Sequence, residues 1–353
     1  MSYDSDRSSL RGTRIDRRTM LKSIGGVVTG VAMGSVSTVS AAAGSYTDES
    51  YNGRRYTKYV PSTNDGSEAV PLLLMMHGCT QSPDGFKDAT QMNQISEENG
   101  FIVVYPEQTT GLYDCWQWFN DANTTRNRGE LTEMVGIVDQ EKNRENIDTQ
   151  RVYIAGFSAG AAFVPNAIVE YADVFAAGAV HSGTMYDVAE SQIEGNTVLF
   201  NCSAGSSTDP VVEGQHAYDR MEQFGITQPV PTIVFHGTND TTVYPCNGHE
   251  AAEQATVTND LALDGSDDGG VDYTADVTNS GSGSSRSYTE YEYHDPHGRA
   301  IVEKYIVDGM GHAWSGGATD GSYTDPGGPD ASQIIWNFFS KWTNTGSSLR
   351  SSD

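Results

Sequence analysis

A serine stands between two glycines in the segment Gly-Phe-Ser-Ala-Gly at residues 156–160. The apolar run Arg151–Ala155 precedes this segment, and Ala159–Tyr171, which has helical periodicity, follows it. A tight strand-to-helix turn of this kind exposes the serine Oγ, and its glycines avoid collisions with neighbouring backbone. The free N–H groups at the start of the helix face developing negative charge. Ser158 is therefore the candidate nucleophile.

A serine nucleophile needs a histidine base and a carboxylate that orients the histidine. Asp240 follows the apolar run Thr232–Phe235, and His312 follows the run Val302–Val307 in a glycine-flanked loop. The three residues occur in the order serine, acid, histidine, which is the chain order of the α/β-hydrolases. We predict that Ser158, Asp240 and His312 form a catalytic triad.

The chain offers other histidines and another acid. His236 precedes a glycine at a strand end, and we expect it to order its own loop. His181 ends a further apolar run and is a candidate for lining the cleft, whereas His216 has the setting of an exposed helical residue. Asp209 is the alternative acid.

A serine that attacks a carbonyl group also needs an oxyanion hole, which is formed by two N–H groups. The residue after the nucleophile, Ala159, supplies one of them. The loop that follows the apolar run Val70–Met76 begins with His77-Gly78-Cys79-Thr80, and the Cys79 N–H is the second candidate. The alternative is that His77-Gly78 is only a tight turn.

Buried strands and helices alternate along the chain, which predicts a mostly parallel sheet and, with the serine turn, an α/β-hydrolase fold. The predicted strands are Val70–Met76, Phe101–Tyr105, Arg151–Ala155, Ala176–Val180, Thr232–Phe235 and Val302–Val307. The predicted helices are Phe86–Asn99, Glu130–Asn143, Ala159–Tyr171, His216–Phe224 and Ser332–Trp342. Tyr51–Tyr59, with an Asn-Gly turn, predicts an antiparallel pair at the sheet edge.

The N-terminal segment has the pattern of an export signal. Arginines precede a short apolar stretch that ends in Ala41-Ala42-Ala43, and Asp16–Lys22 resembles a twin-arginine motif. We therefore expect residues 1–43 to direct secretion, with a membrane anchor as the alternative. A single catalytic domain is expected over residues 44–345, with an acidic loop insertion at 256–287 and a frayed tail at 346–353. We expect no second domain after this catalytic domain.

The composition excludes several partners. The 353 residues include 21 Lys+Arg and 47 Asp+Glu, and the net charge of −26 argues against nucleic acids and anionic membranes. Residues 1–43 hold six basic and three acidic residues, so the remainder has 15 and 44, a net charge of −29. This excess predicts adaptation to a salty exterior, with an ordinary acidic secreted protein as the alternative. We expect a monomer without a cofactor.

Four cysteines, at positions 79, 115, 202 and 246, allow three disulfide pairings, and export to an oxidising compartment favours bridges. No C-x-x-C pair or zinc-type histidine spacing occurs, so we expect no structural metal. A calcium loop within 256–287 is an alternative, but the spacing differs from that of an EF-hand.

Together these segments resemble the polyhydroxybutyrate depolymerase-like esterases, in family order over most of residues 55–343. The matching segments are 72–81, 115–119, 151–160, 175–177, 236–243, 311–314 and 328–332. The chain departs from the family at residues 314–317, which read Trp-Ser-Gly-Gly where the group usually has Trp-Pro-Gly-Gly, and in its 256–287 segment.

The resemblance implies a secreted α/β-hydrolase with the triad given above. It also implies a Cys79–Cys115 disulfide near the oxyanion loop and a Cys202–Cys246 disulfide. The implied reaction is hydrolysis of short-chain hydroxyalkanoate esters, with feruloyl or acetylxylan esters as the alternative because the group includes such esterases. A peptidase and a non-catalytic binding protein on the same scaffold are alternatives from other classes. The complete triad weighs against the binding protein.

Overall fold

The computed structural model describes residues 44–202 and 208–344. The predicted export signal at 1–43 and the predicted tail at 346–353 lie outside the described residues. Within the described ranges, no helix has the length and apolar character needed to cross a membrane.

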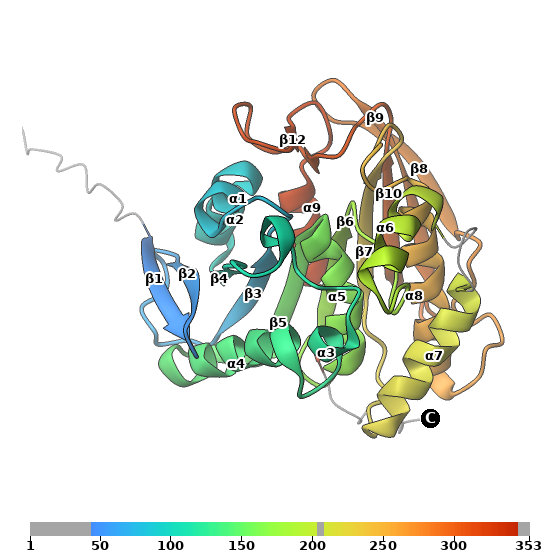
Figure 1. The fold of residues 1–353 in the computed structure, drawn as a ribbon, viewed down its shortest axis with the longest axis horizontal. Helices are drawn as coiled ribbons and strands as arrows, with labels where there is room; N and C mark the ends of the chain where they lie inside the picture. Colours follow the sequence, from blue (N-terminus) through green and yellow to red (C-terminus); the bar gives the residue numbers. More distant parts are fainter. Residues whose placement is uncertain (1–43, 203–207, 345–353) are drawn as a thin grey trace, which may run out of the picture. The chain divides into compact units, whose positions relative to one another are not determined.

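A ten-stranded sheet forms the centre of the described chain, in the order β1-β2-β4-β3-β5-β6-β7-β10-β9-β8 (Figure 1). The strands are β1 (Ser45–Tyr51), β2 (Arg54–Val60), β3 (Val70–Met76), β4 (Ile102–Pro106), β5 (Ile147–Phe157), β6 (Ala177–His181), β7 (Thr232–Gly237), β8 (Val277–Ser282), β9 (Ser287–His294) and β10 (Ala300–Val307). The six strands from β4 to β10 in this order run parallel to one another. Antiparallel strands complete both edges, including the predicted β1–β2 pair. The predicted, mostly parallel sheet is confirmed.

Helices cover both faces of this sheet (Figure 1). One face carries α1 (Pro83–Thr90), α2 (Met92–Asn99) and α9 (Ala331–Phe339). The other carries α4 (Gly129–Arg144), α5 (Ala159–Glu170) and α8 (Cys246–Asp264), with α7 (Pro210–Gln223) packed on α5 and α8. The shorter elements are η1 (Leu112–Asp114), α3 (Asp121–Thr124), α6 (Gln192–Asn201), and the two-residue strands β11 (Trp314–Ser315) and β12 (Thr324–Asp325). Because both faces are covered, central strands such as β3 are apolar along almost their whole length.

Two predicted helices differ most from the helices observed in the structure. The segment Phe86–Asn99 belongs to two helices, because the backbone of Gln91 is left-handed, with φ of 57°, and ends α1. The segment His216–Phe224 is the second half of α7, which begins at Pro210 because the Asp209 side chain caps its N-terminus.

The predicted loop insertion at 256–287 is wrong over much of its length. Residues up to 264 continue α8, and residues 277–282 form β8. Polar side chains in this part of α8 are buried because they form hydrogen bonds: Thr258 Oγ1 donates to the Gly214 carbonyl at 3.1 Å, and Asn259 Nδ2 donates to the Val230 carbonyl at 3.1 Å. The remaining connection, 265–276, is held by Asp260, whose carboxylate accepts three backbone N–H groups.

Candidate active site

The candidate nucleophile lies at a sharp turn between β5 and α5. Ser158 has φ of 55° and ψ of −122°, a conformation that side chains rarely adopt and that persists only where the surrounding structure enforces it. A Cβ at Gly160 would overlap the backbone oxygens of Met76 and His77, and one at Gly156 would overlap the Gly160 backbone. The two glycines therefore let α5 start directly against the end of β3.

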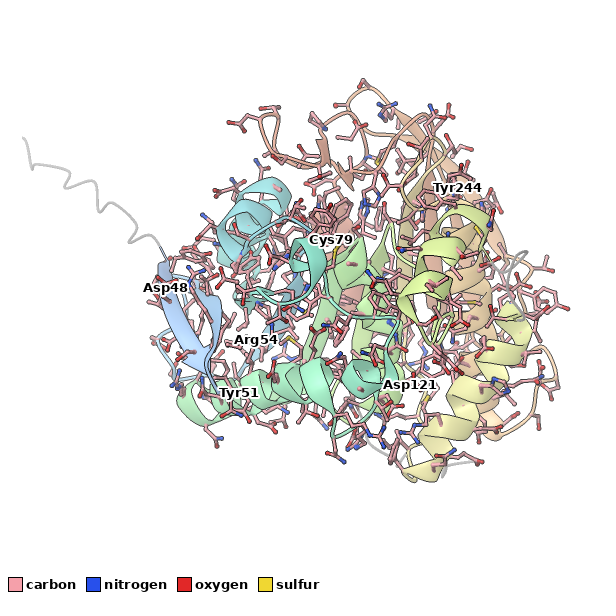
Figure 2. The ribbon with its side chains drawn as sticks, in the orientation of Figure 1. Asp48, Tyr51, Arg54, Cys79, Asp121 and Tyr244 are labelled. Carbon is pink, nitrogen blue, oxygen red and sulfur yellow. A yellow bond between two sulfur atoms is a disulfide. The ribbon has the colours of Figure 1, made fainter. Side chains whose placement is uncertain are left out.

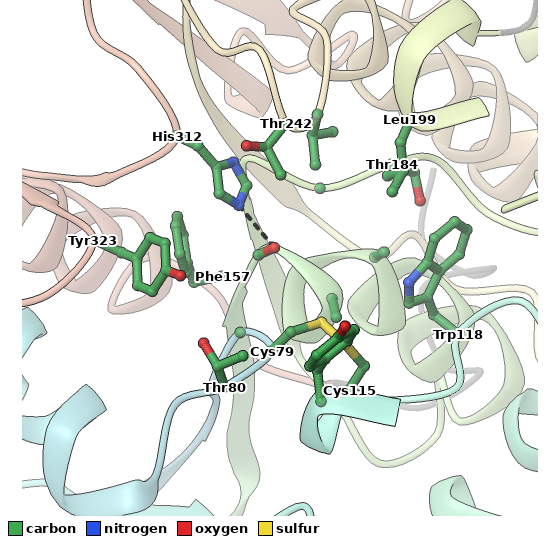
Figure 3. Close-up of a pocket in the computed structure, with 17 residues that line it drawn as sticks. Cys79, Thr80, Cys115, Trp118, Phe157, Thr184, Leu199, Thr242, His312 and Tyr323 are labelled. Atoms are coloured by element: carbon green, nitrogen blue, oxygen red, sulfur yellow. Dashed lines mark hydrogen bonds between the residues drawn. A yellow bond between two sulfur atoms is a disulfide. The ribbon is translucent and has the colours of Figure 1, made fainter. Parts of the chain in front are cut away.

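The structure brings Ser158, His312 and Asp240 into one hydrogen-bonded relay. His312 Nε2 lies 2.8 Å from Ser158 Oγ (Figure 3). His312 Nδ1 lies 2.7 Å from Asp240 Oδ2. With the proton on Nδ1, the imidazole donates to the carboxylate and accepts the serine O–H. A serine held in this way can lose its proton as it attacks an electrophile.

The environment of Asp240 keeps its carboxylate ionised. Burial alone would raise the pKa of Asp240, but the hydrogen bond and charge of His312 and the Val243 N–H hold it below its usual value. The second carboxylate oxygen, Oδ1, accepts the N–H groups of Thr242 and Val243, each at 2.9 Å. This side chain is therefore fixed at both oxygens, which orients the ring of His312.

The loop after β3 lies against the nucleophile. A Cβ built on Gly78 would stand 3.1 Å from the Ser158 Cβ, and the next residue, Cys79, is disulfide-bonded to Cys115. Over the described part of the chain, neither the Cys79 N–H nor the Ala159 N–H has a hydrogen-bond partner in the protein. Both are therefore available to an oxygen placed beside Ser158.

A cavity of about 420 Å³ opens beside Ser158. Trp118 and Leu199 border it on one side of the serine, and Tyr323 and Thr80 border it on the other (Figure 3). The full lining is Gly78, Cys79, Thr80, Tyr113, Cys115, Trp118, Phe157, Ser158, Ala159, Ala162, Gly183, Thr184, Leu199, Thr242, Val243, His312 and Tyr323. This lining carries no Asp, Glu, Lys or Arg, so the cavity suits an uncharged, largely apolar group.

Helix α6, which supplies Leu199 to the cavity, was not among the helices predicted from the sequence. The Cys202–Cys246 disulfide joins its C-terminal end to the start of α8. Tyr244 lies beside α6 (Figure 2), where its N–H donates to the Leu199 carbonyl at 2.8 Å. Both disulfides implied by the family resemblance are thus present in the structure.

The expectation that His181 lines the cleft is wrong. Its ring is fully buried, stacked 4.7 Å from Trp314 and 5.4 Å from Phe235, because the aromatic residues around it close over the end of β6. Its Nε2 accepts the Ser315 N–H at 3.0 Å, so it holds the loop that carries His312. Burial lowers the pKa of His181 well below its usual value, with His236 and His312 adding to the shift.

The other candidates have structural roles. His236 orders its loop as predicted, since its Nε2–H donates to the Val243 carbonyl at 2.9 Å. His216 lies exposed on α7, beside Glu213. Asp209 accepts the Val211 N–H at the start of α7 and does not line the cavity.

A mostly parallel sheet flanked by helices, with the serine between a strand and a helix and the acid and histidine on later loops, defines the α/β-hydrolase fold. Solved structures share this fold. An acetyl xylan esterase from Aspergillus awamori aligns with a TM-score of 0.60 at 20% identity, over 76% of this chain and 94% of its own. The feruloyl esterase module from Clostridium thermocellum aligns with a TM-score of 0.51 at 14% identity, over 76% and 82%.

The chain belongs to the Esterase PHB depolymerase family, whose model matches residues 54–274. It is 34% identical over 274 residues to poly(3-hydroxyalkanoate) depolymerase C of Paucimonas lemoignei, and the match spans 76% of this chain and 59% of that protein. It is 29% identical over 198 residues to feruloyl esterase B of Thermothelomyces thermophilus, spanning 56% and 67%. Acetylxylan esterase A of Emericella nidulans is 30% identical over 203 residues, spanning 56% and 64%.

Proposed function

We propose that this protein is a serine esterase that hydrolyses carboxylic esters through an acyl-enzyme. The observation that carries the proposal is the relay from Asp240 through His312 to Ser158, which faces a cavity beside two unoccupied backbone N–H groups. Membership of a family of esterases supports the same reaction.

In the proposed reaction, Ser158 Oγ attacks the ester carbonyl while His312 Nε2 takes the serine proton. The N–H groups of Cys79 and Ala159 bind the oxyanion, and Asp240 stabilises the imidazolium that forms. His312 then protonates the leaving alkoxide, which departs and leaves Ser158 acylated. Finally, His312 activates a water molecule that releases the acid and restores the serine.

The proposed substrates are short-chain hydroxyalkanoate esters, as oligomers or polyester chains. The cavity lining holds no Asp, Glu, Lys or Arg and is largely apolar, and the cavity volume is in the usual range for small-molecule sites. The similarity to poly(3-hydroxyalkanoate) depolymerase C favours this class. Feruloyl or acetylxylan esters are the second candidate, supported by the similarity to esterases of those names.

A side-by-side assay tests the proposal. Purified protein is given hydroxybutyrate oligomers, polyhydroxybutyrate film, methyl ferulate and acetylated xylan, and the released acid is measured for each. We expect the highest kcat/KM on the oligomers. Higher kcat/KM on methyl ferulate or acetylated xylan would move the assignment to the second candidate, and no acid release from any ester would contradict the esterase function.

We further propose that residues 1–43 direct export by the twin-arginine route and that residues 44–345 act as a single catalytic domain, as a monomer. The two disulfides support an oxidising location. Mass spectrometry of the protein from the culture medium tests the first point. A mature N-terminus near Gly44 is expected, and a cell-bound chain that retains residues 1–43 would favour an anchor instead.

Stability is expected to rise with salt. The chain beyond residue 43 carries a net charge of −29 with five lysines, and the screening length falls from about 30 Å at 0.01 M salt to about 3 Å at 1 M. The measurement is Tm against sodium chloride, with and without a chelator. A Tm that is flat between about 0.1 and 3 M salt would contradict screening, and rescue by calcium alone at low salt would point to a metal site.

A further inference from the structure

We propose that His77 is a positioning residue for the oxyanion hole, because its imidazole fixes the Gly78–Cys79 peptide with the Cys79 N–H directed toward the site beside Ser158. This inference rests on the proposed function, since it concerns how that site binds the oxyanion.

The hydrogen bonds of His77 determine its tautomer. The residue is fully buried just after β3, and its Nε2 lies 3.1 Å from the backbone N–H of Gln108. That N–H can only donate, so Nε2 must accept and carries no proton. The proton is therefore on Nδ1, which lies 2.7 Å from the Gly78 carbonyl oxygen and donates to it.

The planar peptide transmits this contact to the next residue. In a trans peptide the C=O of one residue and the N–H of the next point in opposite directions. The Gly78 carbonyl is held by the His77 ring and also accepts the Gln81 N–H at 3.3 Å. The Cys79 N–H therefore points away from His77, on the side where Cys79 and Ser158 line the cavity.

The hydrogen bonds of the loop at residues 78–81 use every backbone N–H group except that of Cys79. Of the four N–H groups in residues 78–81, three have acceptors within the described protein. Gly78 donates to Gln81 Oε1 at 2.8 Å, Thr80 donates to the Tyr113 carbonyl at 2.7 Å, and Gln81 donates to Gly78. The Cys79 N–H is the fourth, and binding an oxyanion would satisfy it.

The position of His77 is itself fixed by its surroundings. Trp116 Nε1–H donates to the His77 carbonyl at 3.0 Å, and the Trp116 ring lies 5.7 Å from the imidazole. The Cys79–Cys115 disulfide anchors the other side of the loop. Burial lowers the pKa of His77, which keeps the ring neutral and able to accept the Gln108 N–H.

Two substitutions test the two ring nitrogens of His77 separately, namely the Nδ1–H donor and the Nε2 acceptor. His77→Asn places an amide N–H where Nδ1 stands, so it can still hold the Gly78 carbonyl. His77→Gln places its amide where Nε2 stands, so it can accept the Gln108 N–H but loses the donor to Gly78. Loss of one oxyanion donor costs about 10²–10³ in kcat. We expect kcat to fall about 100-fold in H77Q and less than about 10-fold in H77N, with KM unchanged in both.

A transition-state analogue supplies the second readout. Affinity for an alkyl trifluoromethyl ketone, whose adduct on Ser158 carries an oxyanion, should fall in H77Q in parallel with kcat. Thermal melting establishes that each variant is folded. If H77Q does not fold, the kcat of H77N is the test. A loss of 100-fold or more in the kcat of a folded H77N contradicts the proposal.

Other outcomes are equally decisive. A folded H77Q with wild-type kcat and analogue affinity would overturn the role of His77, as would equal losses in H77N and H77Q. Failure of the wild-type protein to hydrolyse any ester would instead overturn the proposed function, so the two failures are distinguishable.

Discussion

Replacing Ser158 with alanine is expected to lower kcat for ester hydrolysis by about 10⁵–10⁶, the size of loss seen when a serine nucleophile is removed from a triad. Every step that His312 and Asp240 assist follows from attack by the serine oxygen, which is hydrogen-bonded to His312, so little of their contribution survives its removal. The measurement is acid release from hydroxybutyrate oligomers by purified S158A and wild-type protein.

The fold should survive this change, because the serine side chain makes one hydrogen bond, to His312, and alanine fits the same space. An unchanged Tm is the control for folding. Substantial activity in a folded S158A would remove Ser158 from the mechanism and leave another group as the nucleophile.

Replacing Asp240 with asparagine is expected to lower kcat by about 10⁴. An asparagine can present an N–H to His312 Nδ1, which would force the imidazole into the tautomer that cannot accept the Ser158 proton. The pKa of Asp240 is held below its usual value, so the wild-type carboxylate is charged at neutral pH. The loss of kcat in D240N should therefore be measurable at neutral pH.

Asp209→Asn is the matched control for this substitution. Asp209 caps α7 and does not line the cavity, and asparagine also caps helices well, so wild-type kcat and Tm are expected. A large loss of kcat in D209N, with D240N active, would show that Asp240 is not the acid.

Much of the sheet and of the relay could be predicted from the sequence, because strong local constraints determine them. Strands covered on both faces must be apolar, and the prediction for β3, Val70–Met76, matches its observed bounds. The glycines around Ser158 are needed for a close approach of α5 to β3, so the motif itself encodes the turn. Asp240 and His312 were placed by chain order and by strand ends, which meet at one edge of a parallel sheet.

The remaining features depend on tertiary contacts that composition does not reveal. Residues 256–264 have the composition of a polar loop. Thr258 and Asn259 are nevertheless buried in α8, because their side chains donate hydrogen bonds to the carbonyls of Gly214 and Val230. Helix α6 has few buried residues, so its hydrophobic periodicity is weak. Its C-terminal end is anchored instead by the Cys202–Cys246 disulfide and by the Tyr244 N–H, which donates to the Leu199 carbonyl. The burial of His181 likewise depends on aromatic residues far away in the sequence, such as Trp314.

The central claim is that Ser158 carries the acyl group during ester hydrolysis, and trapping that intermediate tests it most directly. Wild-type protein is mixed with an activated butyrate ester, quenched in acid within one turnover and examined by intact-mass and peptide mass spectrometry. The account predicts a mass increase of one butyryl group, located on Ser158 in the peptide that contains residues 156–160, and no such adduct in S158A. Ester hydrolysis with the acyl group on a different residue, or with the same adduct in S158A, would contradict it.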